Sequence, residues 1–302
     1  MPVSFASVTA NLCSIWFAKP DLSLQPARRA RLTGAIRLHQ NTNMKTITTT
    51  INHPAISQTH GLPSRVSPRY VHIDTLETLG SLTRNGWQVD DVSAARKRNA
   101  EHIPYAAHMV RLSHPDLPKL GDSRIQAILM NSHDSSRAFR LQFGVFRFAC
   151  LNGLICGASS FGALRLIHHG MMAGDVMTEA QTMISRAPAL VEKVEQFQAK
   201  LLTPEQELAF LSRATMLRWA DKYRMGERGS LIPVTDWARP RREEDNGHSL
   251  WQVLNRAQEA LLRGGTRFGS MTRRAGAVRG LSAQVKINEG VWELAEEFAT
   301  AE

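Results

Sequence analysis

The 302-residue sequence predicts an α+β fold, with a mostly antiparallel sheet in the N-terminal half and helices in the C-terminal half. Between Tyr70 and Gly170, apolar residues alternate in short runs bounded by Pro, Asp and Gly, a pattern typical of strands. After Gly174, apolar residues recur three and four positions apart, the period of an amphipathic helix. We therefore expect residues 70–174 and 175–302 to pack together as one α+β unit.

Residues 1–69 are expected to form an N-terminal extension outside that unit, either disordered or mis-assigned. The first 43 residues carry five Lys or Arg against one acid, and residues 46–68 are rich in Thr, Pro, Ser and Gly without a sustained period. An organelle transit peptide and a disordered arm both fit this composition. The preferred interpretation is a start assigned too far upstream, with Met44 as the true first residue.

The elements of the sheet-rich part begin with a short helix. Asp74 is a candidate N-cap with Glu77 three residues later, and Gly86 suits the left-handed position after the helix. Apolar runs then predict strands or their approaches at four places. These lie at residues 87–96, 106–112, 124–130 and 164–169.

The longest strand is expected over Phe139–Cys150. Its apolar residues occupy odd positions up to Val145 and even positions from Phe146 onward. A one-residue change of phase moves side chains to the other face of a sheet, so we expect a bulge or sharp bend at Gly144.

The helical part contains four candidate segments. One extends from about Met183 to Leu201 and either kinks or begins at Pro188. Two others open with capping boxes, Thr203 with Gln206 and Ser249 with Gln252, and Gly264 ends the latter helix. A last helix is expected from about Asn288 to Phe298.

Composition narrows the classes of function. Three cysteines lack the paired spacing of a disulfide framework or a zinc site, and no apolar run of about 18 residues could cross a membrane. We therefore expect a cytoplasmic protein without a cofactor, with a homo-oligomer left open. The net charge of +10 favours a polyanionic partner, although the first 43 residues supply +4 of it.

Six of the eleven histidines lie between His102 and His169, which raises the possibility of a metal site. No H-E-x-x-H, H-x-H or Cys/His cluster supports one, and few acids accompany them. The run Ser132–His133–Asp134 holds the residue types of a hydrolase triad, but adjacent side chains diverge whereas a triad must converge. No catalytic or metal-binding residue is therefore assigned. The six histidines are His102, His108, His114, His133, His168 and His169.

A basic strip extends from Leu262 to Ile287. It holds six cations, five glycines and no acid, and its Phe268 could stack on a base. Phosphate-backbone binding and an ordinary solvated loop paired with acids such as Glu243, Glu244 and Asp245 are both consistent with this composition. The cations are Arg263, Arg267, Arg273, Arg274, Arg279 and Lys286.

Three segments together resemble a family with a domain of unknown function, described as phage- or plasmid-like and found on plasmids, prophages and genomic islands. They are NSHDSSRAFRLQFGVFRFACLNG (131–153), RPRREEDNGHSLWQVLNRAQEALLRGG (239–265) and VKINEGVWE (285–293). The resemblance covers roughly Tyr70 to Ala299. In the first segment, Arg147 and Asn152 are candidate polar contacts with a ligand or nucleic acid, against the alternative of a turn and packing motif.

These observations favour a non-catalytic nucleic-acid-binding protein, and the resemblance implies a mobile genetic element that uses it in recombination, maintenance or defence evasion. Single-stranded DNA is the preferred ligand, because no helix-turn-helix signature is present and a basic, Gly-rich strip suits sequence-tolerant binding. One alternative is a protein-binding anti-restriction or anti-defence factor. A second is a histidine-dependent metallohydrolase.

Overall fold

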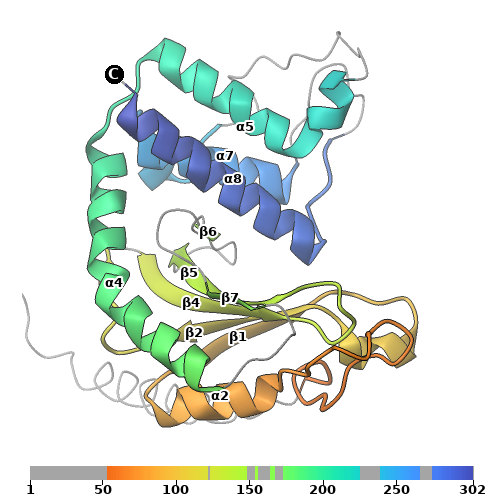
Figure 1. The fold of residues 1–302 in the computed structure, drawn as a ribbon. Coiled ribbons are helices and arrows are strands. Elements are labelled where there is room, and N and C mark those ends of the chain that lie inside the picture. Colours follow the sequence, from red (N-terminus) through yellow and green to blue (C-terminus); the bar gives the residue numbers. More distant parts are fainter. Residues whose placement is uncertain are drawn as a thin grey trace, which may run out of the picture. The chain divides into compact units, whose positions relative to one another are not determined.

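The computed structural model divides the chain into two compact units, Met1–Thr46 and Ile47–Glu302. It describes residues 53–121, 123–147, 154–155, 164–166, 173–224, 239–265 and 274–301. All the elements below belong to the second unit. The α+β class is confirmed, since an antiparallel sheet precedes a set of helices (Figure 1).

The strands are β1 (Gln88–Ala94), β2 (His108–Ser113), β3 (Lys119–Leu120), β4 (Ser123–Asn131), β5 (Phe139–Arg147), β6 (Leu154–Ile155) and β7 (Leu164–Leu166). The helices are α2 (Thr75–Arg84), η1 (Ala100–Tyr105), α4 (Ala173–Ala199), α5 (Pro204–Arg224), η2 (Glu243–Asp245), α7 (Leu250–Arg263) and α8 (Leu281–Thr300).

The described strands form one antiparallel sheet in the order β1-β2-β4-β5-β6, with β3 on β4 and β7 on β5. The strands expected around residues 106–112 and 124–130 are confirmed as β2 and β4 within two residues at each end. The connection from β1 to β2 contains η1, and the one from β2 to β4 contains β3.

The prediction of a bulge or sharp bend at Gly144 is wrong. The pairing of β4 with β5 continues without a shift from Ser123↔Arg147 to Met130↔Arg140, and Gly144 lies opposite Gln126. The change of phase needs no bulge because this strand is covered on both faces. Its odd positions are buried in the main core, and the even position Gln142 is also buried, under α8.

The register shift in the described sheet lies instead in β1, between Val89 and Asp91. Asp90 is the extra residue, and its carboxylate accepts a hydrogen bond from Gln126 of β4. A bulge inserts one residue on one strand and re-aims the side chains beside it.

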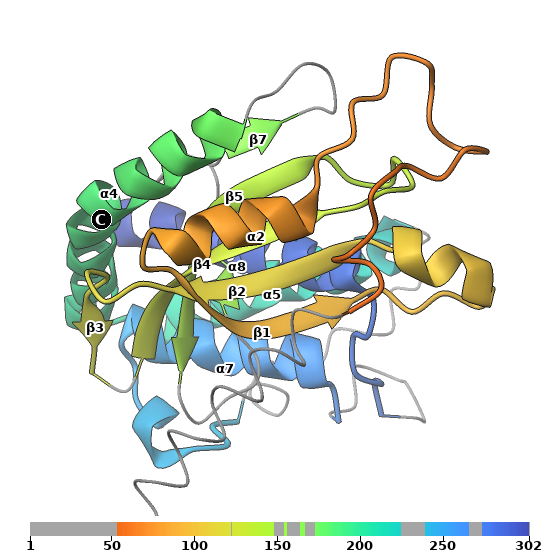
Figure 2. The same ribbon diagram turned by 90° about the horizontal axis from the view of Figure 1, so that it is seen from below.

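Helices cover the sheet from two sides. On one face the odd positions of β4 and β5 pack in the main core with Leu79 and Leu82 of α2 and with the first half of α4. Figure 2 shows α2 lying across the strands on this side. On the other face, Ile128 and Met130 of β4 pack with Leu281 and Val285 at the start of α8.

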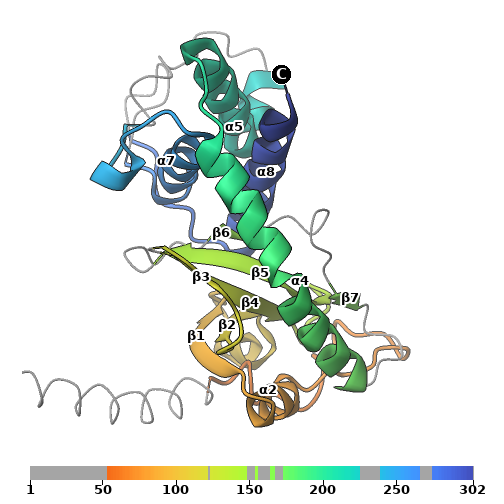
Figure 3. The ribbon, with the colours of Figure 1, turned by 90° about the vertical axis from the view of Figure 1, so that its left-hand side faces the viewer.

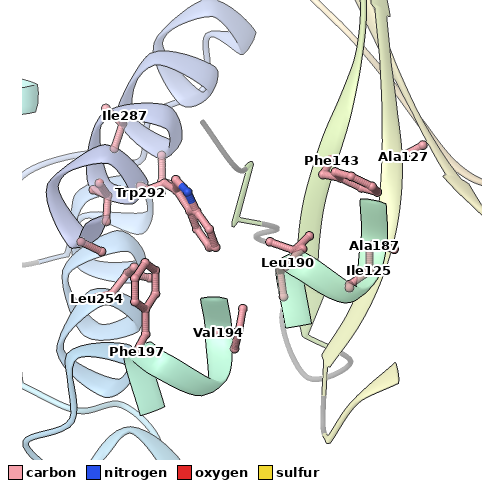
Figure 4. Close-up of a cluster of buried hydrophobic side chains, with 14 of the residues drawn as sticks. Ile125, Ala127, Phe143, Ala187, Leu190, Val194, Phe197, Leu254, Ile287 and Trp292 are labelled. Carbon is pink, nitrogen blue, oxygen red and sulfur yellow. The ribbon is translucent and has the colours of Figure 1, made fainter. Parts of the chain in front are cut away.

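Helix α4 connects the sheet to the other helices (Figure 3). Ala187 and Leu190 lie near Phe143 and Ile125 of the sheet, whereas Val194 and Phe197 point toward α7 and α8 (Figure 4). The rings of Phe197 and Trp292 lie 5.2 Å apart, centre to centre, and both are fully buried. The main core is therefore continuous from the sheet to the helices.

The helix caps expected from the sequence are confirmed. The carboxylate of Asp74 accepts from the Glu77 amide at 2.9 Å, and Gly86 has a φ of +91°. Thr203 and Gln206 exchange reciprocal hydrogen bonds, as do Ser249 and Gln252. These side chains satisfy the amides that the first turn of a helix leaves open.

Three boundaries differ from expectation. Helix α4 begins at Ala173 and continues through Pro188. Helix α8 begins at Leu281, seven residues before Asn288, because Leu281 and Val285 bury their side chains against the sheet. Folded structure also starts before Tyr70, since Ala55 and Ile56 are fully buried.

Candidate nucleic-acid interface

Hydrogen bonds join the C-terminal end of α7, where the basic strip begins, to the segment before α8. The amide of Gly265 donates to the carbonyl of Ala275 at 2.8 Å, and that of Val278 donates to Leu262 at 2.7 Å. The guanidinium of Arg218 donates to the Leu261 carbonyl and, at 2.6 Å, to the Gly276 carbonyl. The end of α7 is thereby fixed to the segment that leads into α8.

In the structure, some cations of the predicted strip are unpaired and one forms an ion pair. Arg274, Arg279 and Lys286 are exposed and form no ion pair with another described residue. Arg263 instead pairs with Glu259 at 2.8 Å, and Glu259 also lies 3.7 Å from Arg242. Glu259 lies on the same helix as Arg263, one turn earlier.

Several predicted site residues lie outside what the structure describes. Arg267, Phe268, Arg273 and Asn152 fall in stretches beyond the described residues. Arg147 ends β5 opposite Ser123, and only its backbone is described.

The fold adds two cations that the sequence did not single out. Ala95, just after β1, packs against the small apolar cluster that joins Leu281 and Val285 to the sheet. Arg96 follows Ala95 directly, and Arg98 lies two residues further; both are exposed. On the other segment, Arg279 lies two residues before Leu281, and Lys286 follows Val285 in α8.

We call Arg96, Arg98, Arg279 and Lys286 the basic rim. Within the described part of the chain, none of these four side chains has an acidic partner. The run Arg96–Lys97–Arg98 was the available signal in the sequence. The sequence could not show that this run lies near the start of α8, because the two segments are about 180 residues apart in the chain.

Lys97, between the two arginines, is fixed in place. Its amine lies 2.6 Å from the Asp134 carboxylate, whose side chain is only 3% exposed. Burial would raise the pKa of Asp134, but hydrogen bonds from Lys97 and Ser136 outweigh burial and hold it below its ordinary value. This ion pair ties the Arg96–Arg98 run to the turn between β4 and β5.

The Ser132–His133–Asp134 run does not form a triad. The hydroxyl of Ser132 donates to the Arg137 carbonyl, His133 Nε2 faces the Ala55 carbonyl at 3.1 Å, and Asp134 binds Lys97. Each side chain is engaged in a different direction, so the run braces the β4–β5 turn.

Two of the six histidines come together with a third that the sequence did not single out. The rings of His108 and His133 lie 5.2 Å apart, and His72 lies 4.6 Å from His133. His114 packs against Trp87 elsewhere, and His168 and His169 are outside the described residues. No group of three or more His, Cys, Asp or Glu among the described residues has an arrangement suited to a metal ion.

Together these features define an α+β protein in which four exposed cations flank, in sequence, members of one small apolar cluster. The chain belongs to the family described as "Domain of unknown function (DUF932)", whose model matches residues 63–292. No solved structure matches the chain.

Two relatives come from Escherichia coli (strain K12). The UPF0380 protein YfjQ is 33% identical over 238 residues, covering 78% of this chain and 84% of the relative. The UPF0380 protein YafZ is 33% identical over 239 residues, with the same coverage of each chain. Across the described residues, no helix combines the length and the apolar character needed to cross a membrane.

Proposed function

We propose that this protein binds nucleic acid without catalysis, with single-stranded DNA as the preferred ligand, in the cytoplasm. We further propose that it serves a mobile genetic element in recombination, maintenance or defence evasion, a role suggested by the resemblance of its sequence to phage- and plasmid-borne proteins. The proposal rests on one observation: the four exposed cations of the basic rim, on two distant segments, lie within three residues of members of one packed cluster.

The chemistry of the rim suits a phosphate backbone. Guanidinium groups donate paired hydrogen bonds to phosphate oxygens, and cations without acidic partners need not break an ion pair before binding. Over β4 and β5 both faces of the sheet carry helices. The proposed contact surface is therefore the rim and the adjoining strip, including Arg274, rather than an open sheet face.

Fluorescence anisotropy tests the proposal with a labelled 30-base single strand, the matching duplex and an RNA strand. The variant replaces Arg96, Arg98, Arg279 and Lys286 with Ser. Four phosphate contacts predict that wild-type affinity for single strands falls roughly 50-fold between 50 and 200 mM salt. The variant should bind all sequences more weakly and with a flatter salt dependence.

A matched control removes the same charge from other surfaces by replacing Arg84, Lys119, Arg186 and Lys193 with Ser. This control should bind as the wild type does if position matters, and more weakly if only net charge does. A second variant, Arg267→Ser with Arg273→Ser and Arg274→Ser, measures the share of the strip. If the wild type binds none of the three probes at 50 mM salt, nucleic-acid binding is wrong and a protein-binding role takes its place.

A further inference from the structure

The carboxylate of Glu289 in α8 is shared by two donors from β5. Nη1 of Arg140 lies 3.4 Å from Oε1 of Glu289, and Nε2 of Gln142 lies 3.3 Å from the same oxygen. Both distances are long for hydrogen bonds to a carboxylate, since charge-assisted contacts are normally about 2.7–2.9 Å. The carboxylate is therefore held loosely, by donors that are able to take another anion in its place.

The contact combines a buried amide with two partly exposed charges. Arg140 and Gln142 lie two residues apart on β5, so their side chains share one face of the sheet. Gln142 is 1% exposed, whereas the side chains of Arg140 and Glu289 are 29% and 22% exposed. The amide thus provides a fixed floor, and solvent reaches the contact from the side of the charged groups.

Arg137, in the turn between β4 and β5, adds a second guanidinium group. It is half-buried and forms no ion pair with another described residue. Burial lowers the pKa of Arg137, the charge of Arg140 lowers it further, and Glu289 opposes the shift. Nε of Arg137 and Oε1 of Gln142 are buried, and neither has a hydrogen-bond partner within the described part of the chain. Two guanidinium groups therefore share one carboxylate, with an excess of positive charge and with unused donors.

On the sheet, these groups adjoin the apolar cluster beside the basic rim. In the pairing of β4 with β5, Met130 lies opposite Arg140, and Ile128 lies opposite Gln142. Ile128 and Met130 both belong to the small apolar cluster whose members the rim cations flank.

On α8, Glu289 follows the rim directly. It lies one turn after Val285 of the same cluster and three residues after Lys286. Residues three apart are neighbours on a helix surface, so Lys286 and Glu289 lie side by side. A strand whose phosphates follow the rim past Lys286 therefore reaches Arg140 next.

We propose that Arg137, Arg140 and Gln142 form a subsite for a phosphate of the nucleic-acid backbone, which the Glu289 carboxylate occupies until the strand displaces it. This inference rests on the proposed function and extends it from the rim to the β4–β5 turn. The non-bridging oxygens of a phosphodiester can accept from both guanidinium groups at once, whereas one oxygen of Glu289 is shared between Arg140 and Gln142. Glu289 is thus a built-in competitor of the strand.

Glu289→Gln tests the subsite, because it removes the competing charge and keeps the shape of the side chain. With the labelled 30-base single strand at 50 mM salt, this variant should bind up to roughly fivefold more tightly than the wild type, the range of a partly exposed ion pair. Glu293→Gln is the matched control, since it removes the same charge from an exposed position one turn later on α8. Equal gains in the two variants would show an effect of net charge alone and overturn the subsite.

Arg140→Gln removes the main donor and should weaken binding roughly tenfold. It should also flatten the salt dependence by about 0.7 log units per log salt, the share of one phosphate contact. In the Arg140→Gln background, Glu289→Gln should bring no gain, because both changes act on one contact. An equal gain in both backgrounds would contradict the inference. Loss of folding cannot produce a gain of affinity, so Glu289→Gln stays informative even if Arg140→Gln lowers the melting temperature.

Two outcomes separate the subsite from the proposed function. If the rim variant binds more weakly but Glu289→Gln and Arg140→Gln bind as the wild type does, nucleic-acid binding stands and the subsite is wrong. If neither the wild type nor Glu289→Gln binds the strand at 50 mM salt, both proposals are wrong. Millimolar inorganic phosphate at constant ionic strength should leave strand binding unchanged. Release of the strand would assign the subsite to a free anion instead of a backbone phosphate.

Discussion

Gly264 ends α7 with a φ of +64° and a ψ of −140°, and a side chain there would clash with the next segment. A Cβ atom would lie 2.3 Å from the Ala275 carbonyl oxygen. We expect Gly264→Ala to destabilise the protein by roughly 1–3 kcal/mol, the cost of a backbone conformation that is nearly restricted to glycine. Urea denaturation followed by tryptophan fluorescence measures the change.

The control for Gly264 lies in the same loop. A Cβ atom at Gly276 meets nothing within 4 Å, and its φ is not positive. Gly276→Ala should therefore change stability little or raise it slightly. Equal losses in the two variants would mean that the close approach at Gly264 has no special role.

Single residues were predictable where the chemistry is local. Asp74, Thr203 and Ser249 cap helices as expected, because a cap depends on the next three residues. The regular strand pairing across Gly144 was not predictable, since the second face of β5 is covered by α8, which lies about 140 residues further along the chain. The position of Arg96 and Arg98 beside the cluster of Leu281 and Val285 was hidden for the same reason.

Pro188 lies in the interior of α4, where it leaves the carbonyl of Ile184 without its usual helical donor. A proline inside a helix lowers the free energy of unfolding by about 3 kcal/mol. Because proline also restricts the unfolded chain, it offsets up to about 1 kcal/mol of that loss. We therefore expect Pro188→Ala to raise the free energy of unfolding by roughly 1–2 kcal/mol. Thermal and urea denaturation check this.

Glu192→Ala, at an exposed position of the same helix, serves as the control and should be near neutral. A loss of stability in Pro188→Ala would indicate that α4 needs its proline to reach both the sheet and the helices around Trp292.

At the scale of elements, periodicity predicted most of the helices and strands, but their ends depended on burial. The expected C-terminal helix was found, yet it starts at Leu281 because an apolar pair, Leu281 and Val285, packs on Ile128 and Met130. From the sequence alone, that stretch looked like the end of a flexible basic loop, since glycines precede it.

For the whole molecule, the division into Met1–Thr46 and Ile47–Glu302 predicts where the chain can be shortened. A chain beginning at Met44 should keep the melting temperature of the full chain. A chain beginning at Tyr70 loses the buried Ala55 and Ile56 and should melt several degrees lower, because an emptied core site of this size costs about 2–5 kcal/mol. Differential scanning calorimetry compares the three chains.

If the chain beginning at Met44 aggregates or melts as early as the one beginning at Tyr70, the first unit contributes to the fold. The sequence placed the start of the fold at Tyr70 because residues 46–68 lack periodicity. These residues are attached by single contacts, Ile56 in the core and the Leu62 amide on the His133 carbonyl, which no periodic pattern reports.

The hydrogen bonds between the end of α7 and the segment before α8 allow residues to be inserted between Gly265 and Ala275 with little loss of fold stability. Gly265 and Ala275 are joined by a backbone hydrogen bond, and Arg218 fastens the same junction from α5. Extra residues added between these two positions would cost only the slowly growing entropy of a longer closed loop, about 0.6 kcal/mol for each doubling. This site is therefore suited to carrying an inserted reporter or affinity peptide.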